Sequence, residues 1–210
     1  MIVLSHRGYW QDVSEKNTPI AFDRSFSLGF GTETDIRDLD GELIISHDPP
    51  QGGCLTVDEF FEIYQQYSPE LYLALNIKAD GLQEKLKKKL AYYNVGKYFV
   101  FDMSVPDALV YNKAGIATFT RESEYETSPS FYDDAIGVWL DEFNGHWIDE
   151  GTIIKHLNNA KQMCIVSPEL HGREPYEEWK AYKSIEEKFG KDRLMLCTDY
   201  PEGAKEFFNG

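Results

Sequence analysis

The sequence predicts an α/β fold, a compact (β/α)8 TIM barrel that spans residues 1–210 as a single domain without a sizeable insertion. The first reason is that short apolar runs alternate with helical patterns along the chain, which is typical of βα units. The second is that eight such units follow one another with no linker, repeat or low-complexity tract. The third is that neither a glycine-rich dinucleotide loop nor a phosphate loop follows the first strand, which disfavours an open doubly wound sheet. A chain of 210 residues is near the lower limit of about 200 for this barrel, so we expect short loops.

The first quarter of the chain carries the clearest local signals. Ile2–Ser5 is an apolar run that indicates a buried strand. A helix follows at Thr18-Pro19, because threonine suits an N-cap and proline suits the first helical position. The runs Thr32–Leu39 and Glu42–Ser46 follow, joined by Asp40-Gly41, a hairpin-type turn signal, and we interpret them as the second strand and its extension.

From residue 57 to the end, helix and strand patterns keep alternating. The further helices are expected at Val57–Tyr67, Leu82–Tyr93, Pro106–Lys113, Ser128–Tyr132 (a helical turn), Asp149–Lys161, Pro175–Phe189 and Ala204–Phe208. The further strands are expected at Tyr72–Lys78, Tyr98–Met103, Ile116–Thr120, Ile136–Leu140, Cys164–Ser167 and Leu194–Cys197.

The composition is acidic, with 36 Asp and Glu against 21 Lys and Arg and a formal net charge of −15. Such a surface repels nucleic-acid phosphates and anionic lipid head groups, so we expect neither nucleic acid nor a membrane surface as a partner. No run approaches the roughly 20 apolar residues of a membrane span, and no signal-peptide pattern opens the chain, so we expect a cytoplasmic protein. Cys164 and Cys197 lie in apolar runs and are expected to be buried thiols.

Polar residues follow the apolar runs where the strands end, which is where (β/α)8 barrels carry their catalytic groups. Glu33 and Asp35 are two residues apart on one strand, and Asn76 and Lys78 are two apart on the next, so each pair shares a face. Carboxylates crowded into one barrel mouth repel each other, and a hard cation such as Mg²⁺ or Ca²⁺ removes that cost. Further candidates at the mouth are Asp102, Asp141, Glu169, His171 and Asp199.

Two histidines at strand ends, His6 and His47, suit general acid–base catalysis near neutral pH. Arg7 and Lys78 are cations that can hold phosphate oxygens. This combination predicts phosphoryl transfer rather than glycoside hydrolysis, which depends on two carboxylates. The remaining histidines are expected on the surface of a helix, for His156, and in a loop, for His146.

Five segments carry a resemblance to a known family. They are His6-Arg7-Gly8, the run Lys16-Asn17-Thr18-Pro19-Ile20-Ala21-Phe22, the trio Gly31, Glu33 and Asp35, the run Ile44-Ile45-Ser46-His47-Asp48, and Thr198-Asp199-Tyr200-Pro201. In this order they resemble the pattern of the glycerophosphodiester phosphodiesterase family, within the phospholipase C-like barrel superfamily. The resemblance spans both ends of the chain, and it is dense in the first half and weak in the middle.

The resemblance implies roles for five residues. It implies that His6 and His47 are the acid–base pair, that Glu33 and Asp35 are metal ligands, and that Arg7 contacts the phosphate. Members of the family cleave a P–O bond beside a neighbouring hydroxyl, often through a cyclic phosphate. One imidazole would then activate the hydroxyl and the other would protonate the leaving alkoxide, on a small-molecule phosphodiester held by one divalent cation.

Three departures from the family pattern bear on this site. The family usually has Glu-x-Lys where this chain has Asn76-Ile77-Lys78, and that Glu is a third metal ligand; an amide oxygen can bind Mg²⁺ or Ca²⁺ but brings no charge. Lys16 stands where the family has Glu, which weakens the surroundings of a cation. The segment Pro49–Leu71 is too short for the family's insertion, so the sequence does not define the leaving-group pocket. The acids that could take the place of the missing carboxylate are Asp102, Asp141 and Glu169.

Two other functions stay open on the sequence alone. A catalytically degenerate barrel could bind a phosphorylated ligand without turnover, for which Asn76 and Lys16 are the main support. A different metal-dependent barrel enzyme, such as a sugar-phosphate isomerase or an aldolase, could use Lys78 as a Schiff-base lysine. The head group, the metal and the oligomeric state are left open.

Overall fold

The computed structural model describes residues 1–190 and 193–209. Its strands are β1 (Ile2–His6), β2 (Gly31–Leu39), β3 (Glu42–Ile45), β4 (Leu73–Ile77), β5 (Tyr98–Phe101), β6 (Phe119–Glu122), β7 (Gly137–Leu140), β8 (Gln162–Val166) and β9 (Leu194–Thr198). Its helices are α1 (Pro19–Ser27), α2 (Val57–Tyr64), α3 (Gln83–Tyr92), α4 (Val105–Lys113), α5 (Glu150–Asn158), α6 (Tyr176–Phe189) and α7 (Pro201–Asn209), with 3-10 turns η1 (Val13–Glu15) and η2 (Pro168–His171).

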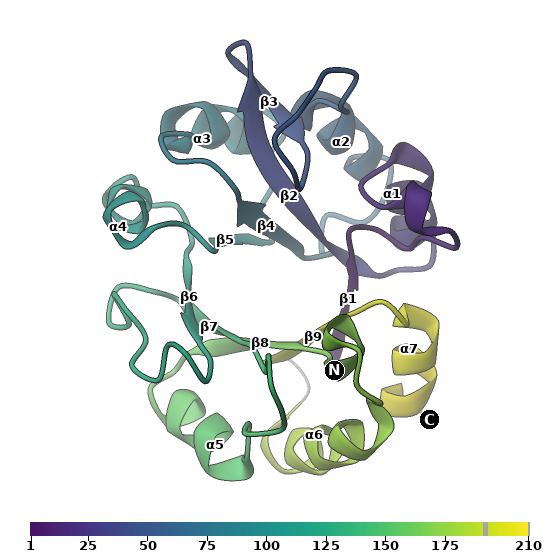
Figure 1. Cartoon of the computed structure of the whole chain (residues 1–210), viewed down its shortest axis with the longest axis vertical. Helices are drawn as coiled ribbons and strands as arrows, with labels where there is room; N and C mark the ends of the chain where they lie inside the picture. The colour runs from purple at the N-terminus through teal and green to yellow at the C-terminus, as the bar shows by residue number, and fades with distance from the viewer. Residues whose placement is uncertain (191–192, 210) are drawn as a thin grey trace.

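Eight of these strands form a nearly closed parallel barrel with the helices outside it (Figure 1). The strand order is β5-β4-β2-β1-β9-β8-β7-β6, and β3 pairs with β2 as an antiparallel hairpin. Between β5 and β6 the described residues form a single parallel bridge, Val100 to Thr118. The fold class predicted from the sequence is therefore confirmed, and no insertion domain interrupts the described residues.

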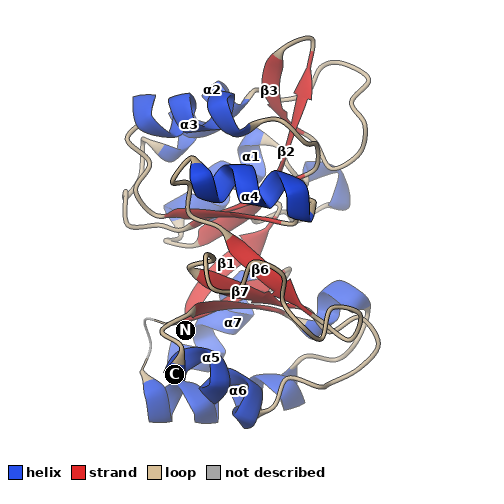
Figure 2. Ribbon diagram, turned by 90° about the vertical axis from the view of Figure 1, so that its left-hand side faces the viewer, coloured by secondary structure: helices blue, strands red, loops and turns tan. Residues whose placement is uncertain are grey.

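The hairpin of β2 and β3 projects at one end of the barrel, opposite the two chain termini (Figure 2). Its turn residues Asp40 and Gly41 have φ angles of 50° and 91°, the left-handed conformation that a tight hairpin turn requires. The same end carries the C-terminal ends of the parallel strands. The predicted active-site residues therefore gather there.

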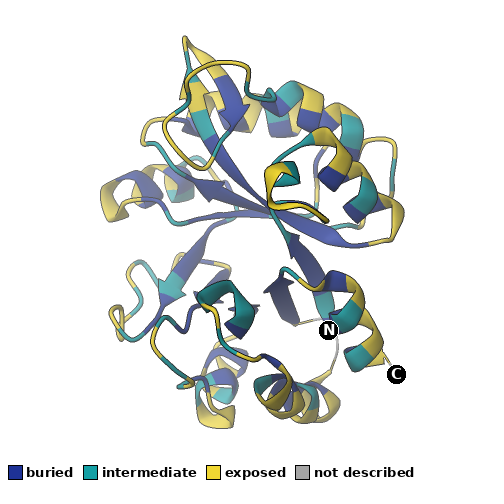
Figure 3. Ribbon diagram, turned by 45° about the vertical axis from the view of Figure 1, so that its right-hand side comes forward, coloured by how far each residue is buried: buried dark blue, intermediate teal, exposed yellow. Residues whose placement is uncertain are grey.

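Alternation along the strands separates the core into an inner and two outer clusters. Leu4, Ala74, Trp139 and Cys197 belong to the cluster inside the barrel, together with the other inward-facing residues. The outer clusters lie between the strands and the helices, α1 to α4 on one side and α5 to α7 on the other. Figure 3 shows the strands buried and the outer faces of the helices exposed. Cys164 and Cys197 are fully buried free thiols, as the sequence predicts.

Most predicted boundaries lie within three residues of the observed ones; for example, the helix expected at Val57–Tyr67 ends at Tyr64, and the helix expected at Ala204–Phe208 begins at Pro201. Two differences change how individual residues are interpreted. The strand expected at Ile116–Thr120 begins three residues later, at Phe119, and continues to Glu122. Ile116 instead packs in the cluster under α3 and α4, so its apolar character reflects helix packing rather than the strand. The segment expected as a helical turn at Ser128–Tyr132 forms only turns, and no helix of the described residues separates β6 from β7.

The prediction that His156 lies on the surface is wrong. Its side chain is fully buried on the inner face of α5. The hydroxyl of Tyr132 lies 2.9 Å from its Nδ1, and a carboxylate oxygen of Glu122 lies 2.7 Å from its Nε2. Burial lowers the pKa of His156, and the Glu122 carboxylate opposes that shift. Its partner Glu122 is at the end of β6, on a different element, so the helical pattern around His156 could not indicate that the imidazole is buried.

None of the helices in the described ranges is both long and apolar enough to cross a membrane.

Candidate active site

The C-terminal ends of the parallel strands surround a cavity of about 260 Å³, which we call the mouth cavity. It is lined by His6, Arg7, Glu33, His47, Asn76, Lys78, Phe101, Asp102, Arg121, Trp139, Asp141, Phe143, Val166, Leu170 and His171. Nine of the twelve residues predicted from the sequence are in this lining. The other three, Asp35, Glu169 and Asp199, lie directly behind it and contact lining residues or their neighbours.

His6 ends β1 and is held by Asp199, which follows β9. The imidazole Nδ1 lies 2.8 Å from Oδ1 of Asp199, so Nε2 is left available to a substrate. Burial lowers the pKa of His6, and Asp199 opposes this shift by its hydrogen bond and its charge. The ring is therefore held in one orientation in a site that favours its neutral form.

Glu169 explains why Asp199 is fixed in place. Its Oε1 accepts the backbone N–H of Asp199 at 3.0 Å and also the hydroxyl of Thr198, and its Oε2 accepts the hydroxyl of Ser167. Lys16 reaches the same region, with Nζ 3.8 Å from Oδ2 of Asp199. Lys16 therefore faces the carboxylate that orients His6.

Glu33, Asp35 and Asn76 point into the barrel from neighbouring strands. Strand register places Glu33 beside His6 and Asp35 beside Asn76. Both carboxylates are buried, and neither points out to bulk solvent. Burial, with the Asp35 charge as the second cause, raises the pKa of Glu33 to about 8.

Asp35 is the anion shared by the two predicted phosphate-binding cations. Its Oδ2 lies 3.1 Å from Nε of Arg7, and its Oδ1 lies 3.6 Å from Nζ of Lys78. The amide of Asn17 also donates to Oδ2 at 2.9 Å. These contacts aim both cations at the mouth cavity, although Asp35 itself does not line it.

Two residues of this region adopt a left-handed backbone that side chains other than glycine rarely take. Arg7 has a φ of 59° and Asp102 a φ of 73°. Such conformations are costly and gather at functional sites, where the surrounding structure enforces them. They mark the ends of β1 and β5 as places where the chain turns sharply to present a side chain.

His47 is the more exposed of the two histidines. It follows β3 in the loop to α2, and its Nδ1 lies 2.9 Å from Oδ1 of Asp48. Its backbone carbonyl oxygen accepts two hydrogen bonds from the guanidinium of Arg37, which fixes the start of the loop. A second cavity, of about 380 Å³, opens on the other side of His47 and Arg7 and shares both residues with the mouth cavity.

The donor set at Glu33, Asp35 and Asn76 fits a hard divalent cation. All three side chains offer oxygen, the ligand atom that Mg²⁺ and Ca²⁺ prefer. Oδ1 of Asp35 and Oδ1 of Asn76 are buried acceptor atoms without a hydrogen-bond donor among the described residues. An ionised Glu33 beside Asp35 is disfavoured without added positive charge, which is the electrostatic condition that a bound cation corrects.

The opposite side of the mouth cavity was largely missed by the sequence analysis. We call it the far wall; it consists of Phe101, Asp102, Arg121, Trp139, Asp141, Phe143, Val166, Leu170 and His171, at the ends of β5 to β8. Arg121 forms an ion pair with Asp102, which also lies 3.5 Å from Nζ of Lys78. Asp102, Asp141 and His171 were predicted from their places after strands. Arg121 was missed because β6 was placed too early, although a charged residue after the apolar run was the available signal.

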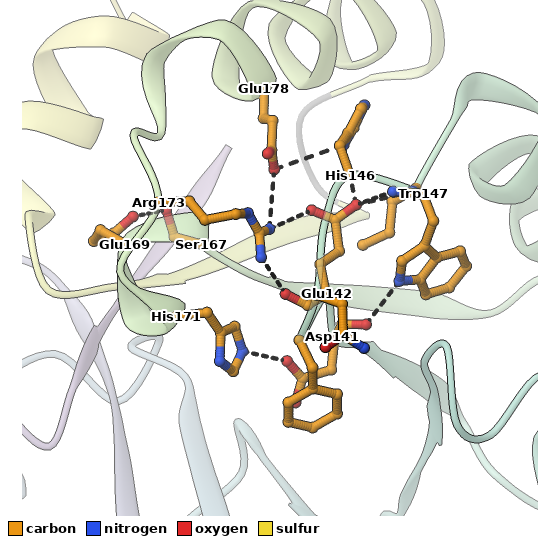
Figure 4. A network of polar contacts seen from close by, with 12 residues as sticks. Asp141, Glu142, His146, Trp147, Ser167, Glu169, His171, Arg173 and Glu178 are labelled. Atoms are coloured by element: carbon orange, nitrogen blue, oxygen red, sulfur yellow. Dashed lines mark hydrogen bonds and ion pairs between the residues drawn. The ribbon is translucent and has the colours of Figure 1, made fainter.

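Glu142, next to Asp141, anchors a polar network behind the far wall (Figure 4). Glu142, His146 and Glu178 each offer a potential metal-ligand atom, and these atoms lie within 4.8 Å of one another. However, Oε1 of Glu142 already accepts two backbone N–H groups, and Oε2 lies 3.2 Å from the guanidinium of Arg173. Since Arg173 supplies the positive charge, the group fits an ion-pair support better than a metal site.

No protein-family model and no curated protein matches this sequence. Solved structures do match its fold. A proposed glycerophosphodiester phosphodiesterase from Galdieria sulphuraria superposes with a TM-score of 0.77 at 17% identity, over 99% of this chain and 97% of that one. A glycerophosphodiester phosphodiesterase from Agrobacterium tumefaciens gives 0.68 at 14% identity, over 98% and 97%. A phosphodiesterase from Oleispira antarctica, solved with the product sn-glycerol-3-phosphate, gives 0.68 at 18% identity, over 100% and 97%. The chain therefore shares the barrel fold of these proteins over almost its full length.

Proposed function

We propose that this protein is a metal-dependent phosphodiesterase that hydrolyses a small phosphodiester of the glycerophosphodiester type. The observation that carries the proposal is the mouth cavity itself. His6, His47, Arg7, Lys78 and the buried Glu33 all line it, although they come from four separate segments of the chain. The full-length fold likeness to glycerophosphodiester phosphodiesterases supports the same activity.

The side chains of this cavity suit a phosphate held between two imidazoles. Arg7 and Lys78, aimed by Asp35, bind the non-bridging oxygens of the diester and stabilise the charge that grows on them. The neutral ring of His6 accepts the proton of the attacking hydroxyl. His47 donates a proton to the alkoxide that leaves as the P–O bond breaks. Asp199 stabilises the imidazolium that forms on His6.

Glu33, Asp35 and Asn76 are the residues that would hold a single Mg²⁺ or Ca²⁺. When bound, such a cation polarises the phosphate and steadies the attacking oxygen. In the family that the sequence resembles, the ligand set contains three carboxylates, whereas here Asn76 would offer a neutral amide as the third ligand. We therefore expect weaker cation affinity than three carboxylates would give.

The test is hydrolysis of sn-glycero-3-phosphoglycerol and of bis(4-nitrophenyl) phosphate by the purified full chain with Mg²⁺ or Ca²⁺. His6→Ala and His47→Ala should each lower kcat by roughly 10²-fold or more, which is the range for loss of an acid–base group. His146→Ala is the matched control, because His146 lies outside the cavity lining. Wild-type rates in both variants would overturn the assignment.

A binding protein without turnover is the second candidate, and two observations favour it. Asn76 brings no charge to the ligand set, and Lys16 adds a positive charge beside the carboxylate of Asp199 that orients His6. Calorimetry distinguishes the two functions, since a pure binding protein would take up sn-glycerol 3-phosphate and release no alcohol from either diester. A Schiff-base role for Lys78 has less support, because its Nζ is ion-paired to Asp35 and Asp102, whereas such lysines lie in apolar or cationic surroundings.

A further inference from the structure

A second histidine–aspartate pair lines the mouth cavity, where β7 and β8 end. Nε2 of His171 lies 2.7 Å from Oδ1 of Asp141, and both residues line the cavity. In the neutral ring this contact places the proton on Nε2, which leaves Nδ1 as a hydrogen-bond acceptor. His6 is held the opposite way, through Nδ1, so the two pairs present different ring nitrogens.

Apart from the carboxylate of Asp141, His171 has apolar neighbours that suit a short carbon chain. The ring of Phe143 lies with its centroid 5.0 Å from the centroid of the His171 ring. Trp139, Val166 and Leu170 line the same cavity, and they belong to or pack against the apolar cluster inside the barrel. A ligand group here therefore meets hydrocarbon on several sides and one acceptor nitrogen.

This part of the cavity is firmly built, because two side-chain pairs join the same two loops (Figure 4). Asp141 and Glu142 follow β7, whereas His171 and Arg173 lie at or just after η2. Behind the Asp141–His171 pair, Arg173 contacts the Glu142 carboxylate at 3.2 Å and also its backbone carbonyl, and Glu142 is fully buried. His171 is therefore fixed before any ligand arrives, which lowers the entropy cost of binding.

The position of the Asp141–His171 pair suits contact with one of the two alcohol groups of a phosphodiester. Arg7 and Lys78 would hold the phosphate on the near side of the cavity, and His171 lies on the opposite wall. A phosphodiester carries two alcohols, and the second cavity beyond Arg7 and His47 offers room for the other one.

We propose that His171, oriented by Asp141, selects the leaving alcohol by accepting a hydrogen bond from one of its hydroxyl groups. The ligand class is a diester whose leaving group is a short neutral polyol. This inference depends on the proposed phosphodiesterase function and names its substrate class.

The experiment compares two diesters that differ only in the hydroxyls of the leaving group, sn-glycero-3-phosphoglycerol and sn-glycero-3-phosphopropanol. The wild-type protein should show a kcat/KM about 3- to 10-fold higher for the glycerol ester, as expected for one hydrogen bond in a partly exposed site. His171→Leu should reduce that ratio to about one. His171→Gln, which restores an acceptor oxygen, should recover part of it, and His146→Leu should leave the ratio unchanged.

A ratio that is the same in the wild type and in His171→Leu overturns the proposal, even if both rates fall together. Loss of folded protein scales both rates equally, so misfolding of a variant cannot imitate the expected change. If the wild type cleaves neither diester, the proposed function fails on its own. The selection is then measured by calorimetry on the same two compounds, and equal Kd values would contradict it.

Discussion

The two walls of the mouth cavity differ in how their charged groups are paired. We call the side opposite the far wall the near wall; it consists of His6, Arg7, Glu33, His47, Asn76 and Lys78, with Asp35 behind them. On the near wall, Glu33 and Asp35 are buried side by side. Asp35 is paired with Arg7 and Lys78, whereas Glu33 forms no ion pair among the described residues and Oδ1 of Asn76 has no hydrogen-bond donor there. On the far wall, each carboxylate has a cation or an imidazole beside it: Asp102 has Arg121, and Asp141 has His171. The near wall is thus electrostatically incomplete at Glu33 in the chain alone, whereas both carboxylates of the far wall have partners.

This contrast suggests that the near wall carries out the reaction and that the far wall recognises the substrate. Unpaired acceptor groups in a buried site cost stability, so they persist where a ligand will complete them. Paired groups hold a fixed shape, which suits selection among substrates. The near wall therefore has the character of a reaction centre, and the far wall that of a rigid recognition surface. The predictions below test this difference, from the largest expected effect to the smallest.

Asp199→Asn should lower kcat by at least roughly tenfold, because His6 loses the carboxylate that orients it and stabilises its charged form. Asp199 raises the pKa of His6 against the effect of burial. Its removal should therefore lower that pKa further and move the acidic limb of the kcat/KM profile to lower pH. A pH–rate profile measures both effects. An unchanged profile with a lower rate would reduce Asp199 to a structural role.

Asn76→Glu should tighten Mg²⁺ or Ca²⁺ binding by about tenfold, since a carboxylate adds a full charge to the ligand set. Calorimetric titration of the cation alone measures this change. Asn158→Glu is the matched control, because it adds the same charge at an exposed position near the end of α5. Equal affinities in both variants would place the cation somewhere other than the near wall.

Arg173→Gln should destabilise the protein, because it leaves the fully buried Glu142 without its cation. Because Arg173 is partly exposed, we expect the free energy of unfolding to fall by about 2 kcal/mol, which corresponds to a fall in Tm of about 4–8 °C for a chain of this size. Lys180→Gln removes an exposed ion pair with Glu177 and should change Tm by less than about 1 °C. Thermal melts at pH 7 compare the two variants. Equal changes would show that the far wall does not depend on paired charge.

Glu33→Gln should change the Tm in the opposite direction to Arg173→Gln and raise it by at least about 2 °C in the metal-free protein at pH 8.5. The raised pKa of Glu33, about 8, means that the folded state keeps its proton after the unfolded chain has lost it. Stability is therefore lost as pH rises from the usual glutamate pKa, about 4.5, through about 8.

Glutamine removes this loss, so the Tm gain should grow between pH 5 and pH 8.5 in the presence of a chelator. Glu70→Gln, at an exposed glutamate, is the control and should show no such trend. A Glu33→Gln variant that is less stable than the wild type at pH 8.5 would refute the idea that the near wall is electrostatically incomplete.

Much of the near wall could be predicted from the sequence because its signals are local. Glu33 and Asp35 are two residues apart on one strand, and the period of two places both on one face without knowledge of the rest of the fold. His6 and Lys78 end or follow apolar strands, and parallel strands end at the same rim of a barrel. These residues do lie where that reasoning puts them. Their roles in metal binding and catalysis stay predictions.

The far wall was harder to predict because its pairs join residues distant in the sequence. Asp141 and His171 are separated by a helix and a strand, and only the pairing of β7 with β8 brings their side chains together, with Nε2 of His171 2.7 Å from Oδ1 of Asp141. Arg121 depended on where β6 begins, and that boundary is set by pairing with β7 rather than by local propensity. His156 was misplaced for the same reason, since its partner Glu122 is on another element.

The sequence by itself determined the alternation of strands and helices, the buried cysteines and the gathering of polar residues at one end of the barrel. Each of these follows from side-chain periodicity within a single segment. Only the tertiary structure decided which charges are paired, because ion pairs such as Asp35 with Arg7 and Lys78 depend on the packing of several strands. It therefore also decided that Glu33 is a buried carboxylate without an ion pair among the described residues.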